Sequence, residues 1–369
     1  MLLTEPWWLA SFARLVDFQA VEPFQHRLLV PAIVSSLGSV LPLGTELLFA
    51  LVEVAGWMAL VIVAHRALVM FEIGKSDLLR RMLAFTVIVP MALHLIAPDL
   101  HFVSAYSEVG GAFELGDSRA QPQFYYSYDL PAAVFTLALF LLVVKFARSR
   151  SRRWFAAYLG LFALATLNRE TTLFLIPIFF ASCYRILGSR ALATTMILQI
   201  SVFVAIQGTL QWLFADHVNP HAGIPGTQYE LHLWTNLALF DDPLYLITYL
   251  ARLGAGLYIP VVLLRSHLDP LLGRSLLLLG IPLFVSALLF GRLQEHRVII
   301  EVMPLLWLGA IQAAAAWSAS STATAAISPY VRCRSRSSGR ASALAARRPR
   351  PAAAASKRTA AVVNRNTDA

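Results

Sequence analysis

Charged side chains are scarce in this chain, and cysteine is almost absent. Only 14 % of the 369 residues are Asp, Glu, Lys or Arg, and there are two cysteines. Because soluble domains carry about 25 % charged residues, this composition excludes an ordinary water-soluble fold. Cys183 lies in an apolar run and Cys333 in a basic tail, so the sequence offers no disulfide framework and no support for a thiol nucleophile.

Motifs that bind nucleotides or activate a hydrolytic nucleophile are also missing. The chain has no P-loop, no glycine-rich dinucleotide motif, no HExxH and no nucleophile elbow. Without a nucleotide-phosphate motif, transport driven by ATP within this chain has no support. No internal repeat is recognisable, which argues against a secondary transporter.

Long apolar runs take the place of these motifs. Hydrophobic residues make up 58 % of the chain, and a run of about 20 apolar residues is long enough to cross the hydrocarbon core of a bilayer as a helix. We therefore predict an all-α, polytopic helical membrane bundle with about nine transmembrane helices. The apolar runs cover residues 46–70, 81–98, 129–147, 154–167, 171–187, 191–214, 243–265, 272–290 and 298–317.

The connectors between these runs alternate in charge. The basic ones lie near residues 66–81, 145–153, 185–190 and 265–274 and in the C-terminal tail. The others, which carry acidic or mixed motifs, lie near residues 99–128, 168–170, 215–242 and 291–297. By the positive-inside rule the basic connectors and the C-terminus are cytoplasmic, and the other connectors are external.

The basic character of the whole chain comes from its tail. Residues 319–369 hold ten of the 30 basic residues and one of the 21 acidic ones, which leaves 20 of each in residues 1–318. A neutral folded part argues against a nucleic-acid partner. We predict an external N-terminal segment with interfacial helices (1–45), a transmembrane bundle (46–317) and a disordered basic cytoplasmic tail (318–369).

The N-terminal segment has no signal peptide, although the charge pattern places it outside the membrane. Trp8, Phe12 and Leu15 have the spacing of an interfacial amphipathic helix. The run 28–42 is too short to span, so we expect a half-buried helix there. We also expect that a first transmembrane helix precedes Met1 in the complete gene.

Two carboxylates, an imidazole and a guanidinium lie within eleven residues of this segment, as Asp17, Glu22, His26 and Arg27. A carboxylate at an external surface can act as a general base, and an arginine can bind a phosphate with two hydrogen bonds. The alternative is a solvated turn that leads into a helix at Pro31.

A second motif, Asn168-Arg169-Glu170, lies between two short apolar runs. Runs of this length form helices of about 21 Å and about 26 Å, against a hydrocarbon core of about 30 Å. The tip of the hairpin is therefore expected at or just below the outer surface, where Arg169 is costly unless it is paired or faces a wet cavity. The alternative is helix capping, with Asn168 as N-cap and Glu170 in the first turn, but this leaves Arg169 unexplained.

A third motif contains Glu295, Arg297 and, within an apolar run, Glu301. Arg297 and Glu301 are four residues apart on one helical face. The simple interpretation is an i,i+4 ion pair, although Arg before Glu is the less favourable order. A charged pair just inside a membrane helix is more often functional.

The two long external connectors, 99–128 and 215–242, are rich in acidic and aromatic residues. Such side chains suit sugar binding, but they also suit an aromatic belt at the membrane interface. Asp216, His217 and His221 have no spacing that matches a known ligand signature. A cofactor is therefore not assigned, and a divalent metal ion is left open without support from a ligand motif.

Four segments together resemble a group of bacterial multi-pass proteins related to the GT-C superfamily of membrane glycosyltransferases. They are Glu22–Pro31, Tyr128-Asp129-Leu130-Pro131, Asn168-Arg169-Glu170-Thr171, and Glu295-His296-Arg297 with Glu301 and Pro304. The resemblance covers roughly residues 5–317. It implies a polyprenyl-phosphate-linked sugar donor, a bacterial inner-membrane location and an acidic residue in the first external loop, which corresponds to Asp17, with Glu22 as second choice. The transmembrane helix that normally leads into that residue does not lie between Met1 and Asp17, so we expect it upstream of Met1.

Sugar transfer from a lipid phosphate requires a carboxylate to accept the proton of the acceptor hydroxyl and fixed positive charge to stabilise the departing phosphate. We expect Asp17 or Glu22 to supply the first, and Arg27, Arg169 and Arg297 the second. Supporting roles are expected for His26, Asn168, Glu170, Glu295 and Glu301. The partners are then the lipid bilayer, a polyprenyl-phosphate-linked sugar and an acceptor that the sequence does not specify. The alternatives are a transporter or lipid-handling protein that binds an anionic headgroup through the same arginines, and a non-catalytic membrane protein.

Overall fold

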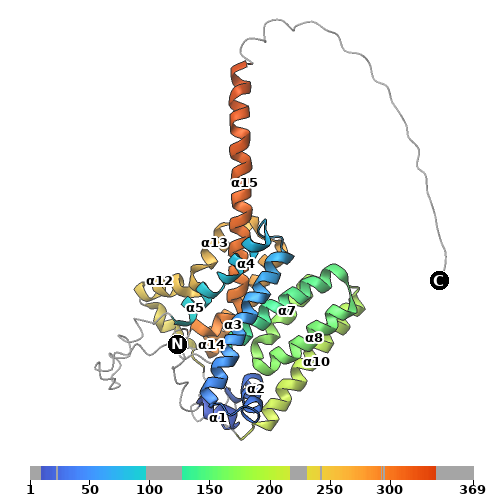
Figure 1. Ribbon diagram of the computed structural model, residues 1–369, viewed down its shortest axis with the longest axis vertical. Coiled ribbons are helices and arrows are strands. Elements are labelled where there is room, and N and C mark those ends of the chain that lie inside the picture. Colours follow the sequence, from blue (N-terminus) through green and yellow to red (C-terminus); the bar gives the residue numbers. More distant parts are fainter. Residues whose placement is uncertain are drawn as a thin grey trace, which may run out of the picture. The chain divides into compact units, whose positions relative to one another are not determined.

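The computed structural model describes residues 10–21, 24–96, 127–216, 231–241, 243–291, 293 and 296–337. All regular secondary structure in these residues is helical (Figure 1). The chain divides into two units, Met1–Ser318 and Ala319–Ala369. The predicted all-α class is therefore confirmed for the described part of the chain.

Five helical stretches among the described residues are long and apolar enough to cross a membrane. They are α3 (Thr45–Met70), α7 (Asp129–Ser149), α10 (Ser189–Leu213), α14 (Pro270–Phe290) and Ile299–Ser320, which includes the start of α15 (Met303–Ser337). The 26 residues of α3 correspond to about 39 Å of helix, more than the hydrocarbon core of about 30 Å. These helices support the prediction of a membrane protein.

The other apolar runs form shorter or interrupted helices. The described part of the run 81–98 contains the end of α4 (Asp77–Phe85) and α5 (Ile88–Ile96), and the runs 154–167 and 171–187 contain α8 (Arg152–Asn168), η3 (Glu170–Phe174) and α9 (Leu175–Cys183). The run 243–265 is divided into α12 (Pro243–Arg252), η5 (Leu253–Gly256), α13 (Tyr258–Leu263) and η6 (Arg265–His267). An apolar run indicates that its residues are buried in protein or lipid, but it does not show that they form one continuous helix. Nine apolar runs therefore do not require nine continuous membrane-spanning helices.

The break at η5 has a local cause. Gly254 and Ala255 have left-handed φ angles of 59° and 50°, which an α-helix cannot contain. A Cβ atom on Gly254 would lie 2.9 Å from Leu306 Cδ1. Glycine therefore allows both the left-handed turn and the close approach of α15.

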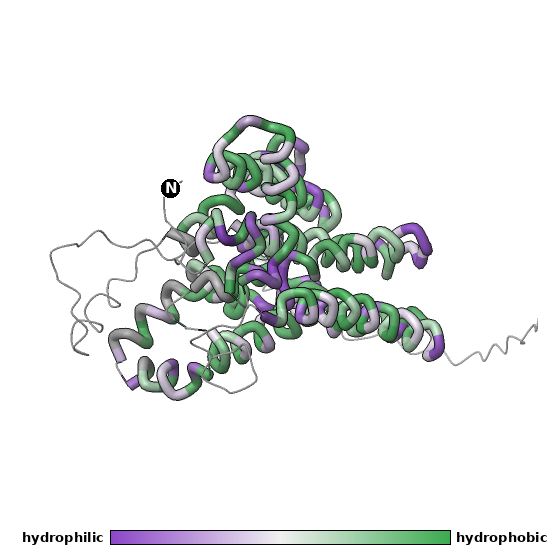
Figure 2. Tube along the Cα trace, turned by 90° about the horizontal axis from the view of Figure 1, so that it is seen from below, coloured by the Kyte–Doolittle hydropathy of each residue, from purple (hydrophilic) through white to green (hydrophobic). Residues whose placement is uncertain are grey.

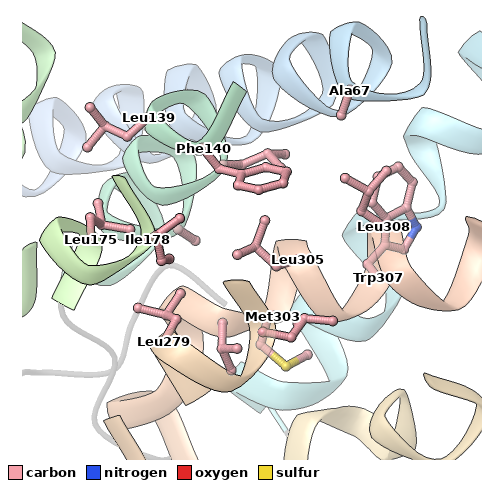
Figure 3. Close-up of a cluster of buried hydrophobic side chains, with 14 of the residues drawn as sticks. Ala67, Leu139, Phe140, Leu175, Ile178, Leu279, Met303, Leu305, Trp307 and Leu308 are labelled. Carbon is pink, nitrogen blue, oxygen red and sulfur yellow. The ribbon is translucent and has the colours of Figure 1, made fainter. Parts of the chain in front are cut away.

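Helix α7 is the centre of the first unit. Of its apolar window 61 % is buried, compared with 22 % for α3 and 6 % for α10. It packs against α3, α8, α9 and η7 (His296–Val302). Figure 3 shows part of the core, where Phe140 of α7 lies near Ile178 of α9 and Leu305 of α15. This largely buried helix thus connects early and late parts of the chain.

The N-terminal residues form a second, smaller core on the start of α3. It includes α1 (Phe12–Val16), η2 (Phe24–His26) and α2 (Leu29–Gly38). Phe12 stacks on Phe49 of α3 with 4.5 Å between ring centroids, and the buried Tyr128 belongs to the same cluster. The ten-residue helix α2 agrees with the predicted half-buried helix, whereas Trp8 of the predicted interfacial helix lies outside the described residues.

Much apolar surface faces outward on α3 and α10, as expected for helices in contact with lipid. Met58 and Ile62 of α3 and Val204 of α10 are each more than half exposed. The hydropathy colouring in Figure 2 is hydrophobic along most of the helices, and hydrophilic colour gathers near the middle of the view and at helix ends. A surface this apolar is stable only when something other than water covers it.

Connectors of one predicted membrane side meet in space. At one end of α7, Arg148 Nη1 donates a hydrogen bond of 3.1 Å to the carbonyl oxygen of Met70, the last residue of α3. At the other end, Asn168 Nδ2 donates a bond of 3.0 Å to the carbonyl oxygen of Tyr128, just before α7. The end of α7 that begins at Asp129 carries the polar motifs.

Candidate functional site

Arg169 is the centre of a buried charged cluster at the start of α7. Its side chain is 4 % exposed, its Nη1 lies 3.2 Å from Asp129 Oδ1, and its Nε lies 3.1 Å from Glu301 Oε1. Glu301 also accepts a hydrogen bond of 2.5 Å from Thr171 Oγ1. One guanidinium therefore connects α7, the turn after α8 and η7.

The turn after α8 places this arginine. Helix α8 ends at Asn168, and the backbone of Arg169 is extended, with φ −162°. Thr172 Oγ1 donates a hydrogen bond of 2.8 Å to the Arg169 carbonyl oxygen, which stabilises the first turn of η3. The expected burial and pairing of Arg169 at the hairpin tip are both observed.

Asn168 does not have the capping role considered as the alternative. It is the last residue of α8, and its fully buried side chain donates to the Tyr128 carbonyl oxygen instead of capping the next helix. The reason is that α8 ends beside the start of α7, where the amide reaches the Tyr128 carbonyl oxygen, which also accepts a hydrogen bond of 3.1 Å from Ala132 N. Asn168 is thus a link between α8 and α7.

Arg27 forms a second ion pair with Glu170, with 3.1 Å between Nη2 and Oε1. Its guanidinium lies 4.5 Å from the centroid of the Tyr128 ring and 5.8 Å from that of Phe24. Burial raises the pKa of the Glu170 carboxyl, but Arg27 and Arg169 lower it more strongly, to about 2. The carboxylate of Glu170 is therefore ionised at neutral pH and is too weak a base for general base catalysis.

Glu301, which the sequence spacing pairs with Arg297, is bound by Arg169. Arg297 belongs to η7, but its side chain is outside the described part of the chain. Glu301 turns toward α8 because η7 packs against α7 and α14. The pairing across helices was not predictable from spacing within one helix.

The two candidate bases are Asp17 and Glu22, of which Asp17 belongs to the described part of the chain. Asp17 directly follows α1 and its side chain is exposed; among the described residues it makes no ion pair with the Arg169 cluster. Glu22 and Glu295 lie outside the described residues. His26 is buried, with its ring 6.4 Å from that of Phe214 at the end of α10.

A small cavity borders the cluster. It is lined by Ala132, Phe135, Thr136, Ala165, Arg169, Thr172, Leu175 and Glu301, with about 10 Å³ of space for the centre of a water molecule. This is room for roughly one water, whereas small-molecule sites measure about 300–1,000 Å³. The cavity can hydrate Arg169 but cannot hold a sugar or a phosphate group.

Asn236 is a well-placed polar residue that the motif search missed. It lies in α11 (Leu233–Ala238), which leads into η4 (Leu239–Asp241), and it is fully buried. Its Nδ2 donates to the carbonyl oxygens of Leu288 at 2.9 Å and Gly291 at 2.7 Å, and its Oδ1 accepts from Leu293 N at 3.0 Å. Asn236 thereby holds the end of α14 and the start of the 291–297 motif. Because the partners of Asn236 are backbone atoms, which every residue has, the sequence does not indicate which residues it binds.

Within the described residues, no group of three or more His, Cys, Asp and Glu side chains is arranged to hold a metal ion. His217, His221 and most of the connector 99–128 lie outside those residues. The arrangement that the structure does describe is chemically simple: two arginines, three carboxylates and a threonine hydroxyl meet at one end of the central helix.

These observations define an all-helical protein with five apolar helices of membrane-crossing length in its described part and a buried charged cluster at one end of α7. No protein-family model, no curated protein and no solved structure matches the chain.

Proposed function

We propose that the protein is an integral membrane glycosyltransferase-like enzyme that transfers a sugar from a polyprenyl-phosphate donor at the external face of a bacterial inner membrane. The observation that carries this proposal is the meeting of three separate motifs, around Arg27, Arg169 and Glu301, at one end of α7. Residues 143 and 130 positions apart in the sequence, Arg27 with Glu170 and Thr171 with Glu301, are in direct contact there.

The chemistry of the transfer fits residues at this end. A departing lipid phosphate requires positive charge that is already in place, and one such donor is worth about 2.7–4 kcal/mol of barrier. Arg27 offers a guanidinium whose buried Nε has no hydrogen-bond partner in the described residues. Asp17, which is exposed, is the proposed general base, since Glu170 is held as an ionised partner of Arg27.

We further propose nine membrane crossings with a cytoplasmic C-terminus. Interrupted helices such as α12 and α13 cross a membrane when neighbouring helices satisfy the freed backbone groups. The short helix α8 and the η3–α9 segment form a hairpin whose tip carries Arg169. This topology is supported by the basic connectors, because Arg148 contacts the end of α3 at the opposite end of α7 from Asp129.

A lipid-handling protein without catalytic activity is the second candidate. It is favoured by the small size of the cavity at Arg169 and by the pairing of both described arginines of the site with carboxylates. The two candidates differ in what they do to a lipid-linked sugar. An enzyme releases free polyprenyl phosphate in detergent, whereas a lipid-handling protein binds the lipid and leaves it unchanged.

The test uses the full chain, with any natural upstream segment, in detergent with a set of radiolabelled polyprenyl-phosphate sugars. We expect time-dependent release of polyprenyl phosphate by the natural protein and none by the Asp17→Asn variant, with unchanged membrane insertion. Asp77→Asn, which alters another exposed aspartate in a connector predicted to be cytoplasmic, is the matched control and should keep full activity. Full activity of Asp17→Asn removes Asp17 from the mechanism, and absence of release with every donor favours the second candidate.

A further inference from the structure

The three carboxylates of the cluster are not equally fixed. Asp129 and Glu301 have side-chain exposures of 0 % and 4 %, and both are paired with Arg169. Glu301 is held additionally by the Thr171 hydroxyl. Glu170 is 26 % exposed, and its carboxylate has a single hydrogen-bonding side-chain partner among the described residues, Arg27. Glu170 is therefore the carboxylate that can leave its partner at the lowest cost.

The two arginines differ in the same way. Arg169 is enclosed by two carboxylates and by a cavity with room for roughly one water. Arg27 has one carboxylate partner and a side chain that is 9 % exposed, against two partners and 4 % for Arg169. Tyr128 lies against the guanidinium plane at 4.5 Å and keeps it in place. An additional anion can therefore bind Arg27 and not Arg169.

We propose that the Arg27–Glu170 pair is an exchangeable anion site, in which the Glu170 carboxylate occupies the place that a lipid phosphate takes when it binds. A phosphate oxygen and a carboxylate oxygen accept hydrogen bonds from arginine with the same geometry and similar lengths. The displaced carboxylate is already partly exposed, so it moves toward solvent and does not enter apolar surroundings. The inference rests on the proposed function only in its choice of a polyprenyl phosphate as the anion.

This arrangement makes Glu170 a selectivity element. A weak or badly placed anion does not displace a carboxylate that is held at 3.1 Å, whereas a phosphate anchored by its lipid tail is present at a high local concentration. In the empty state Glu170 also supplies the charge that the buried guanidinium of Arg27 needs, because an unpaired buried charge is costly. Glu170 therefore opposes anion binding, which is the reverse of a supporting role.

The experiment measures equilibrium binding of radiolabelled undecaprenyl phosphate to the purified full chain in detergent. Glu170→Gln removes the competing charge with little change in shape, and we expect a dissociation constant lower by about tenfold, equivalent to 1.4 kcal/mol. Glu301→Gln is the matched control, since it removes the same charge from the fixed cluster, and it should not tighten binding. Arg27→Gln should abolish binding in the same assay.

Competitors separate the possible sources of the anion. Uncharged undecaprenol should not displace the label, and inorganic phosphate should displace it only at millimolar concentrations. If inorganic phosphate displaces the label as well as the lipid does, the site is for free phosphate and the lipid assignment is wrong. Unchanged or weaker binding by Glu170→Gln contradicts the proposed exchange. Equally tighter binding by Glu301→Gln also contradicts it, because the effect of Glu170→Gln would then be a general effect of charge.

A measurement on the natural protein does not depend on whether the variants fold. Carbodiimide labelling of carboxylates, mapped by mass spectrometry, should increase at Glu170 when undecaprenyl phosphate is added and should not change at Glu301. No increase at Glu170 contradicts the exchange. The outcome is separate from that of the transfer assay. Exchange without sugar release supports the anion site and contradicts the proposed enzyme activity. Sugar release without exchange supports the enzyme activity and contradicts the anion site.

Discussion

Replacing Arg169 with glutamine removes the guanidinium that Asp129 and Glu301 both face. Asp129 is fully buried and Glu301 is 3 % exposed, so neither carboxylate can recover the hydration that it has in bulk water. Removal of one partner from a buried ion pair costs about 3–5 kcal/mol, mainly because an uncompensated charge remains. The second carboxylate places Arg169→Gln at the upper end, so we expect the free energy of unfolding to fall by about 5 kcal/mol.

The assay is reversible denaturation of the full chain in mixed micelles, followed by circular dichroism. Arg148→Gln is the matched control, because it removes an exposed guanidinium that makes one hydrogen bond to a backbone carbonyl; its cost should be below about 1 kcal/mol. The double variant Arg169→Gln/Glu301→Gln should be more stable than Arg169→Gln alone, since it leaves one buried carboxylate fewer. The reasoning is refuted if Arg169→Gln costs no more than Arg148→Gln.

Two further predictions concern a buried asparagine and a glycine in a left-handed conformation. Asn236→Ala should lower the free energy of unfolding by about 2–3 kcal/mol, because buried carbonyl groups lose their donor. Asn168→Ala, which removes a single hydrogen bond, should cost about half as much in the same denaturation assay, and equal costs would contradict the difference in bonding. Gly254→Ala should destabilise by about 1–2 kcal/mol, since it adds a Cβ at a left-handed φ and 2.9 Å from Leu306. Gly208→Ala has open space around the new atom and should be neutral or stabilising by up to about 1 kcal/mol, so a loss at Gly208 equal to that at Gly254 would refute the steric argument.

The helical class and the burial of Arg169 could be predicted because each depends on local information. Runs of apolar residues specify helices in protein or lipid, and two short helices draw the residue between them toward the hydrocarbon. The partners of Arg169 could not be predicted in this way. Asp129 is 40 positions from Arg169, and spacing along a chain reports neighbours within one helix only.

The interruption of the run 243–265 shows a second limit. Its hydrophobicity is continuous, but the sequence Leu253-Gly-Ala-Gly256 adopts left-handed backbone angles. Glycine within an apolar run permits such a break and does not require it. In the folded chain Leu306, from a distant helix, lies close to Gly254 and leaves no room for a side chain there. This contact cannot be read from the apolar run itself.

The order of the charged residues along the chain has a consequence for biosynthesis. Asp129 and Arg169 stand at the two outer ends of a helical hairpin, α7 and α8, and are synthesised well before Glu301. The hairpin can therefore enter the bilayer with its two charges already neutralising each other, which lowers the cost of inserting either one. Glu301 arrives last, at the start of the final apolar stretch, and meets a guanidinium already in place. The pair of Arg169 with Asp129 can therefore form within the hairpin, before the pair with Glu301.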